Sequence, residues 1–149
     1  MNELSTESTI PSITKEANDA LCGMACKMIE EFPDLDLPLK QWITDGIYYR
    51  TLFLPAGFVI ISAMVKIPTT VLITGDCLAT IGDHVERFTG ICNVKASANR
   101  RVAYRALEDT FITMYFKTSA TDVTEAEKEM TDEFDLLTNH REELMLGNE

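Results

Sequence analysis

The chain has 149 residues, 46% of them hydrophobic, and a formal net charge of −11. This length and hydrophobic content indicate one globular domain with appendages and exclude a disordered chain. The net acidity argues against nucleic acid as a partner. The longest apolar run, residues 58–65, is far shorter than the roughly 20 residues that span a bilayer, so no membrane partner is expected.

The charge is unevenly distributed along the chain. Residues 1–39 hold two Lys/Arg and eight Asp/Glu, residues 40–118 hold nine and six, and residues 119–149 hold two and ten. A mildly basic centre therefore lies between acidic arms, which are either solvated or contact basic surfaces of a neighbouring subunit or partner. The start of the chain is polar and acidic, without the basic and apolar regions of a signal peptide, so we expect a product of the cytoplasm or of a virion.

The N-terminal part, residues 1–39, is predicted to hold a loose arm, a helix and a proline-rich connector. The arm ends at Pro11, and Ser12 is a suitable N-cap for the helix that follows. The predicted helix has apolar residues three and four positions apart, which places them on one face: Ile13, Ala17, Leu21, Met24 and Met28. Pro33 and Pro38 end the helix and favour an extended connector.

Residues 40–118 are predicted to form a β-barrel. Segments rich in β-branched and aromatic residues alternate with turn signals at 55–57, Gly75-Asp76, Gly82-Asp83 and Gly90. Short strands at this spacing are typical of a sandwich or barrel, and no segment between them is long enough for the crossover helix of a parallel sheet.

Residues 119–149 are predicted to form an acidic helical tail. Asp122 or Thr124 is suited to cap a helix that begins with the next residues, and a second, weaker helical segment spans residues 140–146.

Cysteine and histidine do not suggest a metal centre. Without an export signal, we expect Cys22, Cys26, Cys77 and Cys92 to be reduced and to act as small buried hydrophobic residues. His84 has Asp83 and Glu86 nearby, which allows a weak metal site, but an exposed turn is the alternative that we favour. His140 lies in the tail and is interpreted in the same way.

About residues 35–130 carry a motif pattern that supports a family resemblance. The matching residues are Gly46, Tyr48, Arg50, Pro55, Ala56, Gly57, Arg101, Val102, Tyr104, Glu108, Asp109 and Thr110. In this order they resemble a group of small cupin-like proteins carried by bacteriophages and prophages. The resemblance implies a mainly β fold, a cupin-like (jelly-roll type) β-barrel with flanking N-terminal and C-terminal helices, and assembly into a homo-oligomer.

The chain departs from that group at the metal-binding positions. Many members of the group carry two histidines after the Pro-Ala-Gly turn and a third near Glu-Asp-Thr. The corresponding positions fall near Val65, Thr69 and Leu107, whose side chains offer no nitrogen or carboxylate to a metal ion. We therefore predict a barrel with no metal or other cofactor, its interior filled by side chains.

The best candidates for a pocket or a subunit interface are six polar residues of the predicted barrel. They are Tyr48, Arg50, Lys66, Arg101, Tyr104 and Glu108. Inward-pointing Tyr and Arg are suited to bind a carboxylate, sugar or phosphate, and both types are also enriched at interfaces. Adjacent Glu108 and Asp109 would face opposite sides of a strand, and we expect a structural role for them, such as bonding Arg101 or capping a turn. No catalytic residue is assigned.

Three functional hypotheses remain open. The first is a non-enzymatic oligomeric structural or interaction module of phage type, associated with the virion or with a host protein, whose partners are further copies of itself and other phage structural or host proteins. The second is a metal-free cupin or isomerase that binds a small molecule such as a sugar, nucleotide or carboxylate. The third is a divergent metalloenzyme with unusual ligands.

Overall fold

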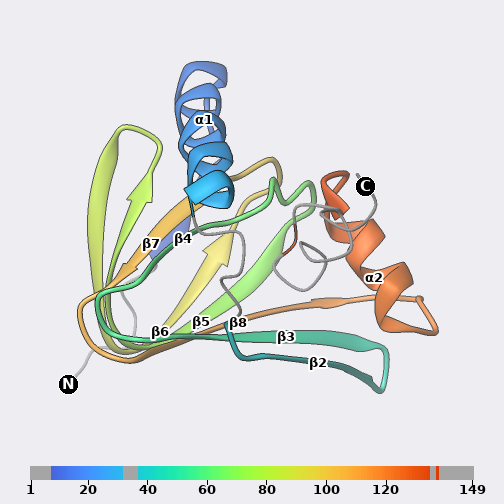
Figure 1. The fold of residues 1–149 in the computed structure, drawn as a ribbon. Coiled ribbons are helices and arrows are strands. Elements are labelled where there is room, and N and C mark those ends of the chain that lie inside the picture. Colours follow the sequence, from blue (N-terminus) through green and yellow to red (C-terminus); the bar gives the residue numbers. More distant parts are fainter. Residues whose placement is uncertain (1–7, 32–36, 135–136, 138–149) are drawn as a thin grey trace.

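The computed structural model describes residues 8–31, 37–134 and 137, and in them the chain forms eight strands and two helices (Figure 1). In chain order these are β1 (Ser8–Ile10), α1 (Lys15–Glu31), β2 (Leu39–Thr44), β3 (Ile47–Leu54), β4 (Val59–Ile61), β5 (Thr69–Ile81), β6 (His84–Ala96), β7 (Val102–Ala106), β8 (Thr110–Lys117) and α2 (Val123–Met130).

The long hairpin of β5 and β6 belongs to two layers. These strands pair along their whole length, from Thr69↔Ala96 to Ile81↔His84. On its other edge, β5 pairs first with β8, over residues 70–74, and then with β7, over residues 77–81. One layer therefore runs β1-β6-β5-β8-β3-β2, and the second branches from β5 through β7 to β4 (Figure 1).

Gly75 allows β5 to change from one layer to the other. Its φ is +141°, and a Cβ added there would lie 2.6 Å from the carbonyl oxygen of Asp109 and from Oγ1 of Thr110. The β7–β8 turn is held against the same bend, because the carbonyl of Asp76 accepts the N–H of Leu107 at 2.8 Å. Only glycine tolerates both this backbone conformation and this close approach.

The strand breaks predicted at Gly75-Asp76 and at Gly90 are wrong. Gly75 and Gly90 lie opposite each other inside the β5–β6 ladder, where they bend continuous strands. Of the three glycines Gly75, Gly82 and Gly90, Gly82 is the one in a turn, because it lies in the connection between β5 and β6. A glycine within a β pattern marks a bend as readily as a turn, and sequence alone does not separate the two.

Replacing Gly75 by alanine is expected to lower the free energy of unfolding by about 3 kcal/mol, since the backbone strain and the steric overlap add. Gly23→Ala is a matched control, because an added Cβ there meets nothing within 4 Å and the site lies inside α1. That change is expected to raise stability by about 0.5–1 kcal/mol. Denaturant unfolding measures both, and equal effects would contradict the role given to Gly75.

The N-terminal arm is more ordered than predicted. β1 pairs in parallel with β6, from Ser8↔Val94 to Ile10↔Ala96, and the side chain of Ile10 is fully buried. The expectation of a loose arm over residues 1–11 is therefore wrong for residues 8–10, which form a strand. Residues 1–7 lie outside the described part of the chain.

The predicted helix is present as α1, with a different cap. Thr14 Oγ1 accepts the N–H of Ala17 at 3.2 Å, whereas the predicted cap, Ser12, donates to the carbonyl of Ala98. The helix stands over the outer side of β4 and β7 (Figure 1), where Leu21 packs with Ile61 and Ala103.

The buried face of α1 is only partly the predicted one. Leu21 of α1 packs with Ile61 and Ala103 on the outer side of the second layer. Three further residues pack against this cluster: Ile13, just before α1, and Ala25 and Met28 within it. Met24 is 52% exposed, although its spacing placed it on the same face. Much of the predicted connector, residues 32–36, lies outside the described residues.

The acidic C-terminal helix is confirmed over α2. Asp122 is its N-cap, and its side chain accepts the N–H of Glu125 at 2.9 Å. In Figure 1, α2 lies at the end of the molecule near the β2–β3 turn, away from the tip of the β5–β6 hairpin. The second helical segment, predicted at residues 140–146, falls outside the described residues.

Candidate functional site

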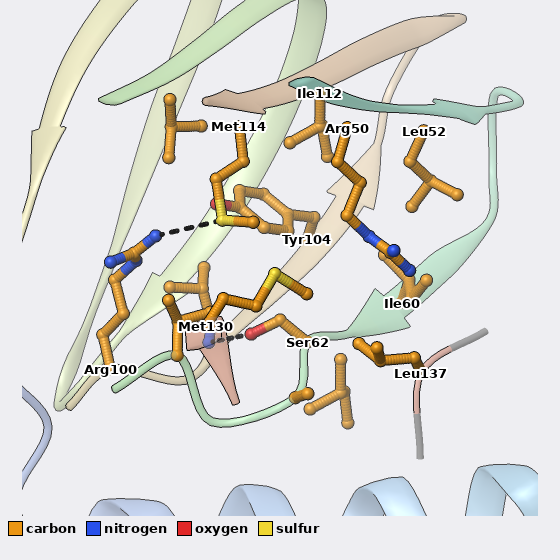
Figure 2. A pocket seen from close by; sticks show the side chains of 15 residues that line it. Arg50, Leu52, Ile60, Ser62, Arg100, Tyr104, Ile112, Met114, Met130 and Leu137 are labelled. Atoms are coloured by element: carbon orange, nitrogen blue, oxygen red, sulfur yellow. Dashed lines mark hydrogen bonds between the residues drawn. The ribbon is translucent and has the colours of Figure 1, made fainter. Parts of the chain in front are cut away.

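A cavity of about 110 Å³ lies between the two layers of the fold (Figure 2). It is lined by Arg50, Leu52, Ile60, Ile61, Ser62, Ala63, Val65, Val71, Arg100, Val102, Tyr104, Ile112, Met114, Met130 and Leu137. Most of this surface is apolar, and two arginines and a tyrosine supply its main polar groups.

Strand alternation places these side chains inside. On β3 the even-numbered residues face inward, and the register pairs Arg50 with Met114 and Leu52 with Ile112. Since side chains on one face of a ladder lie next to their partners, these four residues form one wall. Tyr104 enters from β7 in the second layer, where it pairs with Ile60 of β4.

The C-terminal segment contributes to the wall through Met130 and Leu137, and acidic residues attach it to the β-sheet part of the fold. Glu127 Oε2 lies 3.0 Å from Arg50 Nη1, Asp132 Oδ1 lies 2.6 Å from Lys66 Nζ, and Glu133 pairs with Arg101.

These three ion pairs show what part of the acidic C-terminal arm contacts. The sequence suggested solvated arms or contacts with a neighbouring subunit, but in the described residues these carboxylates bind basic residues of the same chain. Only Glu127 is almost wholly buried, with 1% of its side chain exposed. The Lys66–Asp132 pair is largely exposed, so it contributes little to stability.

One end of the cavity has a compensated charge. Arg50 Nη1 donates to Glu127 Oε2 at 3.0 Å and to the Tyr48 hydroxyl at 3.3 Å, and that hydroxyl donates to Gln41 Oε1 at 2.7 Å. Burial raises the pKa of Tyr48 above its usual value, so it stays neutral. Arg50 therefore belongs to a closed hydrogen-bond network with a carboxylate in it.

The other end has an arginine without a counter-ion in the described part of the chain. Arg100 is 3% exposed. Its Nη1 donates to the carbonyls of Ile67 (3.2 Å) and Ser97 (2.9 Å), and its Nη2 donates to Thr69 Oγ1 (2.5 Å) and lies 3.5 Å from Met114 Sδ. Burial lowers the pKa of Arg100 to about 10, which still leaves a cation at neutral pH.

Tyr104 adds a polar group to the same end. It is 6% exposed, and in the described residues its hydroxyl has no hydrogen-bond partner. Figure 2 shows the hydroxyl directed toward the side of the cavity where Arg100 and Met114 lie. Burial raises the pKa of Tyr104 to about 12, with a smaller opposing effect of Arg100, so the group is a neutral donor at physiological pH.

The structure brings together only some of the candidate residues. Arg50 and Tyr104 line the cavity, and Tyr48 supports Arg50 from beside it. Lys66 points to the exposed Asp132 instead. Arg100 was not predicted from the sequence as a site residue, because the family pattern contains its neighbour Arg101.

Arg101 faces away from the cavity. Its Nε donates to Asn18 Oδ1 of α1 at 2.8 Å, and its Nη1 donates to the carbonyl of Ser62 at 3.0 Å. Arg100 and Arg101 sit just before β7, where neighbouring side chains point to opposite sides. A signal for Arg100 was available in the sequence, since the inward Val102 and Tyr104 are two and four residues further along.

Glu108 and Asp109 do not lie on a strand. Both are exposed in the β7–β8 turn, so the expectation that one of them faces inward is wrong. The Asp109 carboxylate accepts the N–H of Ala56 at 3.0 Å and links this turn to the Pro-Ala-Gly turn. A structural role, such as capping a turn, was predicted for the pair, and the hydrogen bond of Asp109 to the Pro-Ala-Gly turn agrees with it.

The positions expected of metal ligands have other surroundings. Val65 lines the cavity and Thr69 binds Arg100, whereas Leu107 is 39% exposed in the β7–β8 turn. Within the described residues, no group of three His, Cys, Asp or Glu side chains is placed to hold a metal ion. The interior is not filled as predicted, because the cavity remains.

The cysteines and histidines are mostly on or near the surface. Cys77 alone among the four cysteines is fully buried, and burial raises the pKa of its thiol to about 11; Cys26 is exposed, so the expectation of four buried thiols is wrong. All four are free thiols. His84 is exposed, and its hydrogen bonds to Glu86 and Asp83 raise its pKa. His140 lies outside the described residues.

Comparisons with known proteins find similarity at the level of structure. No family model and no curated protein match the chain. Among solved structures, a cupin superfamily protein from Desulfitobacterium hafniense has a TM-score of 0.47 at 11% identity, over 56% of this chain and 79% of the other. Ectoine synthase from P. lautus has a TM-score of 0.48 at 15% identity, over 68% of this chain and 83% of the other.

A third similar structure is a cupin-2 domain protein from Shewanella frigidimarina, with a TM-score of 0.45 at 8% identity, over 59% of this chain and 89% of the other. Similarity at this level carries no conclusion about ligand or activity. The predicted fold class is confirmed in that the chain is mainly β with flanking N-terminal and C-terminal helices, and its sheet is not closed. Among the described residues, no helix is long and apolar enough to cross a membrane.

Proposed function

We propose that this chain is a metal-free binding module that holds a small organic molecule in the cavity between its two layers. The observation that carries the proposal is a cavity that has a charged guanidinium at one end, together with a hydroxyl that has no hydrogen-bond partner in the described residues. Buried polar groups in proteins are normally paired, so groups left without a partner in a cavity point to a ligand.

The lining supports binding rather than catalysis. Among the described residues that line the cavity there is no histidine, cysteine or carboxylate, and the hydroxyl of Ser62, the aliphatic alcohol there, accepts the N–H of Val102. Tyr104, with its pKa raised to about 12, is a poor base at neutral pH. An isomerase needs at least one group that takes and returns a proton, so a binding role fits this surface better.

The size of the cavity limits the ligand. An engineered cavity of about 150 Å³ in another protein accommodates benzene, which has six non-hydrogen atoms, so the smaller 110 Å³ here suits a molecule of about four to six non-hydrogen atoms. A nucleotide exceeds this size, whereas a short carboxylate or a small polyol does not.

Thermal unfolding with small ligands tests the proposal. A ligand at 100 times its Kd stabilises the folded state by about 2.7 kcal/mol, which corresponds to a rise in Tm of roughly 5–10 °C for a domain of this size. We expect such a rise with at least one small sugar or carboxylate, and we expect it to be unchanged by EDTA. Loss of the shift in EDTA would favour a metal site instead.

A cavity-filling variant provides the control. Ala63 lines the cavity, and Ala63→Phe is expected to remove the ligand-dependent rise in Tm, while Ala56→Phe, on the exposed Pro-Ala-Gly turn, is expected to preserve it. If both variants keep the full shift, the ligand binds elsewhere and the proposal fails.

A second candidate, the oligomeric interaction module of phage type, is favoured by a separate surface. The outward residues of β2, β3 and β8 form an aromatic face, defined as Trp42, Tyr49, Phe53, Phe111 and Tyr115. Tyr49 stacks between Trp42 (5.3 Å) and Tyr115 (5.6 Å), and Trp42 and Phe111 are 43% and 48% exposed. Exposed aromatic residues are enriched at interfaces between proteins.

If the aromatic face joins two copies, as the phage-type hypothesis requires of a homo-oligomer, light scattering at micromolar concentration will give a dimer or larger. Phe111→Lys is then expected to yield monomers, whereas Val85→Lys, exposed at the far hairpin, is expected to leave the assembly intact. A wild-type monomer that is absent from purified virions would contradict this candidate.

A further inference from the structure

We infer that the ligand of the cavity is a small monocarboxylate with a short apolar body, held by Arg100 and Tyr104; this inference rests on the binding function proposed above. The carboxylate would accept hydrogen bonds from the Arg100 guanidinium and the Tyr104 hydroxyl, and its hydrocarbon part would lie against Met114, Met130 and Val71.

Charge balance is the first argument. A buried cation is costly unless an anion compensates it. The two arginines that line the cavity differ in this respect, because Arg50 pairs with the buried Glu127, whereas Arg100 forms no ion pair in the described residues. One uncompensated positive charge matches one negative charge, which favours a monoanion over a phosphate dianion.

The hydrogen bonds of Arg100 leave donors for that anion. Nη1 is occupied by two backbone carbonyls, but Nη2 has a thioether as one of its partners, and in the described residues Nε has no acceptor. A thioether sulfur is a weak acceptor. A carboxylate oxygen that replaced the contact with Met114 would make a stronger, charge-assisted bond along the Nε–Nη2 edge.

The guanidinium is also fixed in place before any ligand binds. The carbonyls of Ile67 and Ser97 and the hydroxyl of Thr69 hold it from behind, at 2.5–3.2 Å. A donor that is already ordered loses little conformational entropy on binding, so its bonds to a ligand contribute more fully to affinity.

Tyr104 supplies the second donor. Its hydroxyl lies on the Arg100 side of the cavity that both residues line (Figure 2). A neutral hydroxyl beside a guanidinium is suited to the second oxygen of a carboxylate. In the absence of an anion, this hydroxyl would be left without a partner in a buried site, which proteins usually avoid.

The apolar part of the cavity wall favours a hydrocarbon chain as the uncharged part of the ligand. Aliphatic side chains and two methionines form most of the wall, and methionine adapts to irregular shapes. A sugar would leave several hydroxyl groups facing this apolar surface without partners, and this desolvation disfavours it. A carboxylate with about two to four carbons in all satisfies both the polar end and the apolar wall and fits the volume of the cavity.

Matched ligands that differ only in charge test the inference. Isothermal titration of the wild-type chain in EDTA is carried out with propionate and butyrate, with propionamide and butyramide as neutral analogues, and with methyl phosphate, which has as many non-hydrogen atoms as butyrate, as a second anion. We expect the carboxylates to bind at least tenfold more tightly than their amides and more tightly than methyl phosphate.

Variants at the polar end then locate the interaction. Arg100→Met is expected to reduce the carboxylate-to-amide affinity ratio to about one, and Tyr104→Phe is expected to weaken carboxylate binding about tenfold. Arg87→Met, an exposed arginine on β6 that pairs with Asp76, is the control and is expected to keep the wild-type ratio. The carboxylate and the amide are compared within the same variant, so a partial loss of folded protein affects both affinities equally and leaves their ratio unchanged.

The outcomes separate this inference from the function on which it rests. Equal binding of amides and carboxylates, tighter binding of methyl phosphate, or a carboxylate preference that survives in Arg100→Met would overturn the monocarboxylate inference while leaving a small-molecule binder. If none of these probes binds and the wider ligand screen also gives no Tm shift, both proposals fail.

Discussion

Glu127→Gln is expected to lower the free energy of unfolding by about 3 kcal/mol, one of the largest single-residue effects in this chain. Glu127 is 1% exposed, and it pairs with Arg50, whose side chain is 12% exposed. The glutamine keeps the shape of the side chain but removes the negative charge, so the buried Arg50 cation loses its counter-ion. Urea unfolding followed by circular dichroism measures the change.

Glu125→Gln is the matched control, because the same chemical change is made two residues earlier on the exposed side of α2. Its effect is expected to stay within about 0.5 kcal/mol. The double variant Arg50→Met with Glu127→Met is expected to recover most of the lost stability, since removing both charges avoids an unpaired one. A large effect of Glu125→Gln, or no recovery in the double variant, would argue against a buried ion pair as the cause.

The sequence was most informative about strand faces. The i, i+2 spacing of Tyr48 and Arg50 placed both on one side of β3, and in the structure both face inward. The Asp122 cap of α2 was also readable, because a short polar side chain just before an acidic, helix-favouring run is a local signal. Predictions of this kind succeed because the responsible interactions lie within a few residues of one another.

The sequence was less informative where distant segments meet. β1 is formed only because residues near 8–10 align with the edge of β6, more than 80 residues later. Gly75 bends β5 because the turn at Asp109 and Thr110 packs against it. Neither partner is visible locally, so a strand was taken as a loose arm and a bend was taken as a turn.

The candidate site shows the same limit in another form. The family resemblance directed attention to Arg101, while the residue that lines the cavity is its neighbour Arg100. Which of two adjacent arginines faces inward depends on the start of β7 and on its pairing with β4 and β5. The predicted loss of a metal also suggested a filled interior, but filling depends on the volumes of side chains from many strands, which no single motif encodes.

The second large effect is expected at Arg101, because this one side chain connects three segments. Its guanidinium binds Asn18 of α1, the carbonyl of Ser62 and the carboxylate of Glu133, and it is 2% exposed. Arg101→Met removes all three connections and leaves their acceptors without this donor. We expect a loss of about 3 kcal/mol in the free energy of unfolding.

The position of Asn18 makes the prediction more specific than a general loss of stability. α1 is attached to the outer side of β4 and β7 through a small apolar cluster and this hydrogen bond, so Arg101→Met is expected to free α1 before the β-sheet unfolds. Limited trypsin digestion should then cut at Lys15 and Lys27 several times faster than in the wild type. Arg105→Met, exposed on the same strand β7, is expected to leave both stability and digestion unchanged. If α1 is cleaved at the wild-type rate in Arg101→Met while overall stability falls, Arg101 stabilises the β-sheet rather than attaching the helix to it.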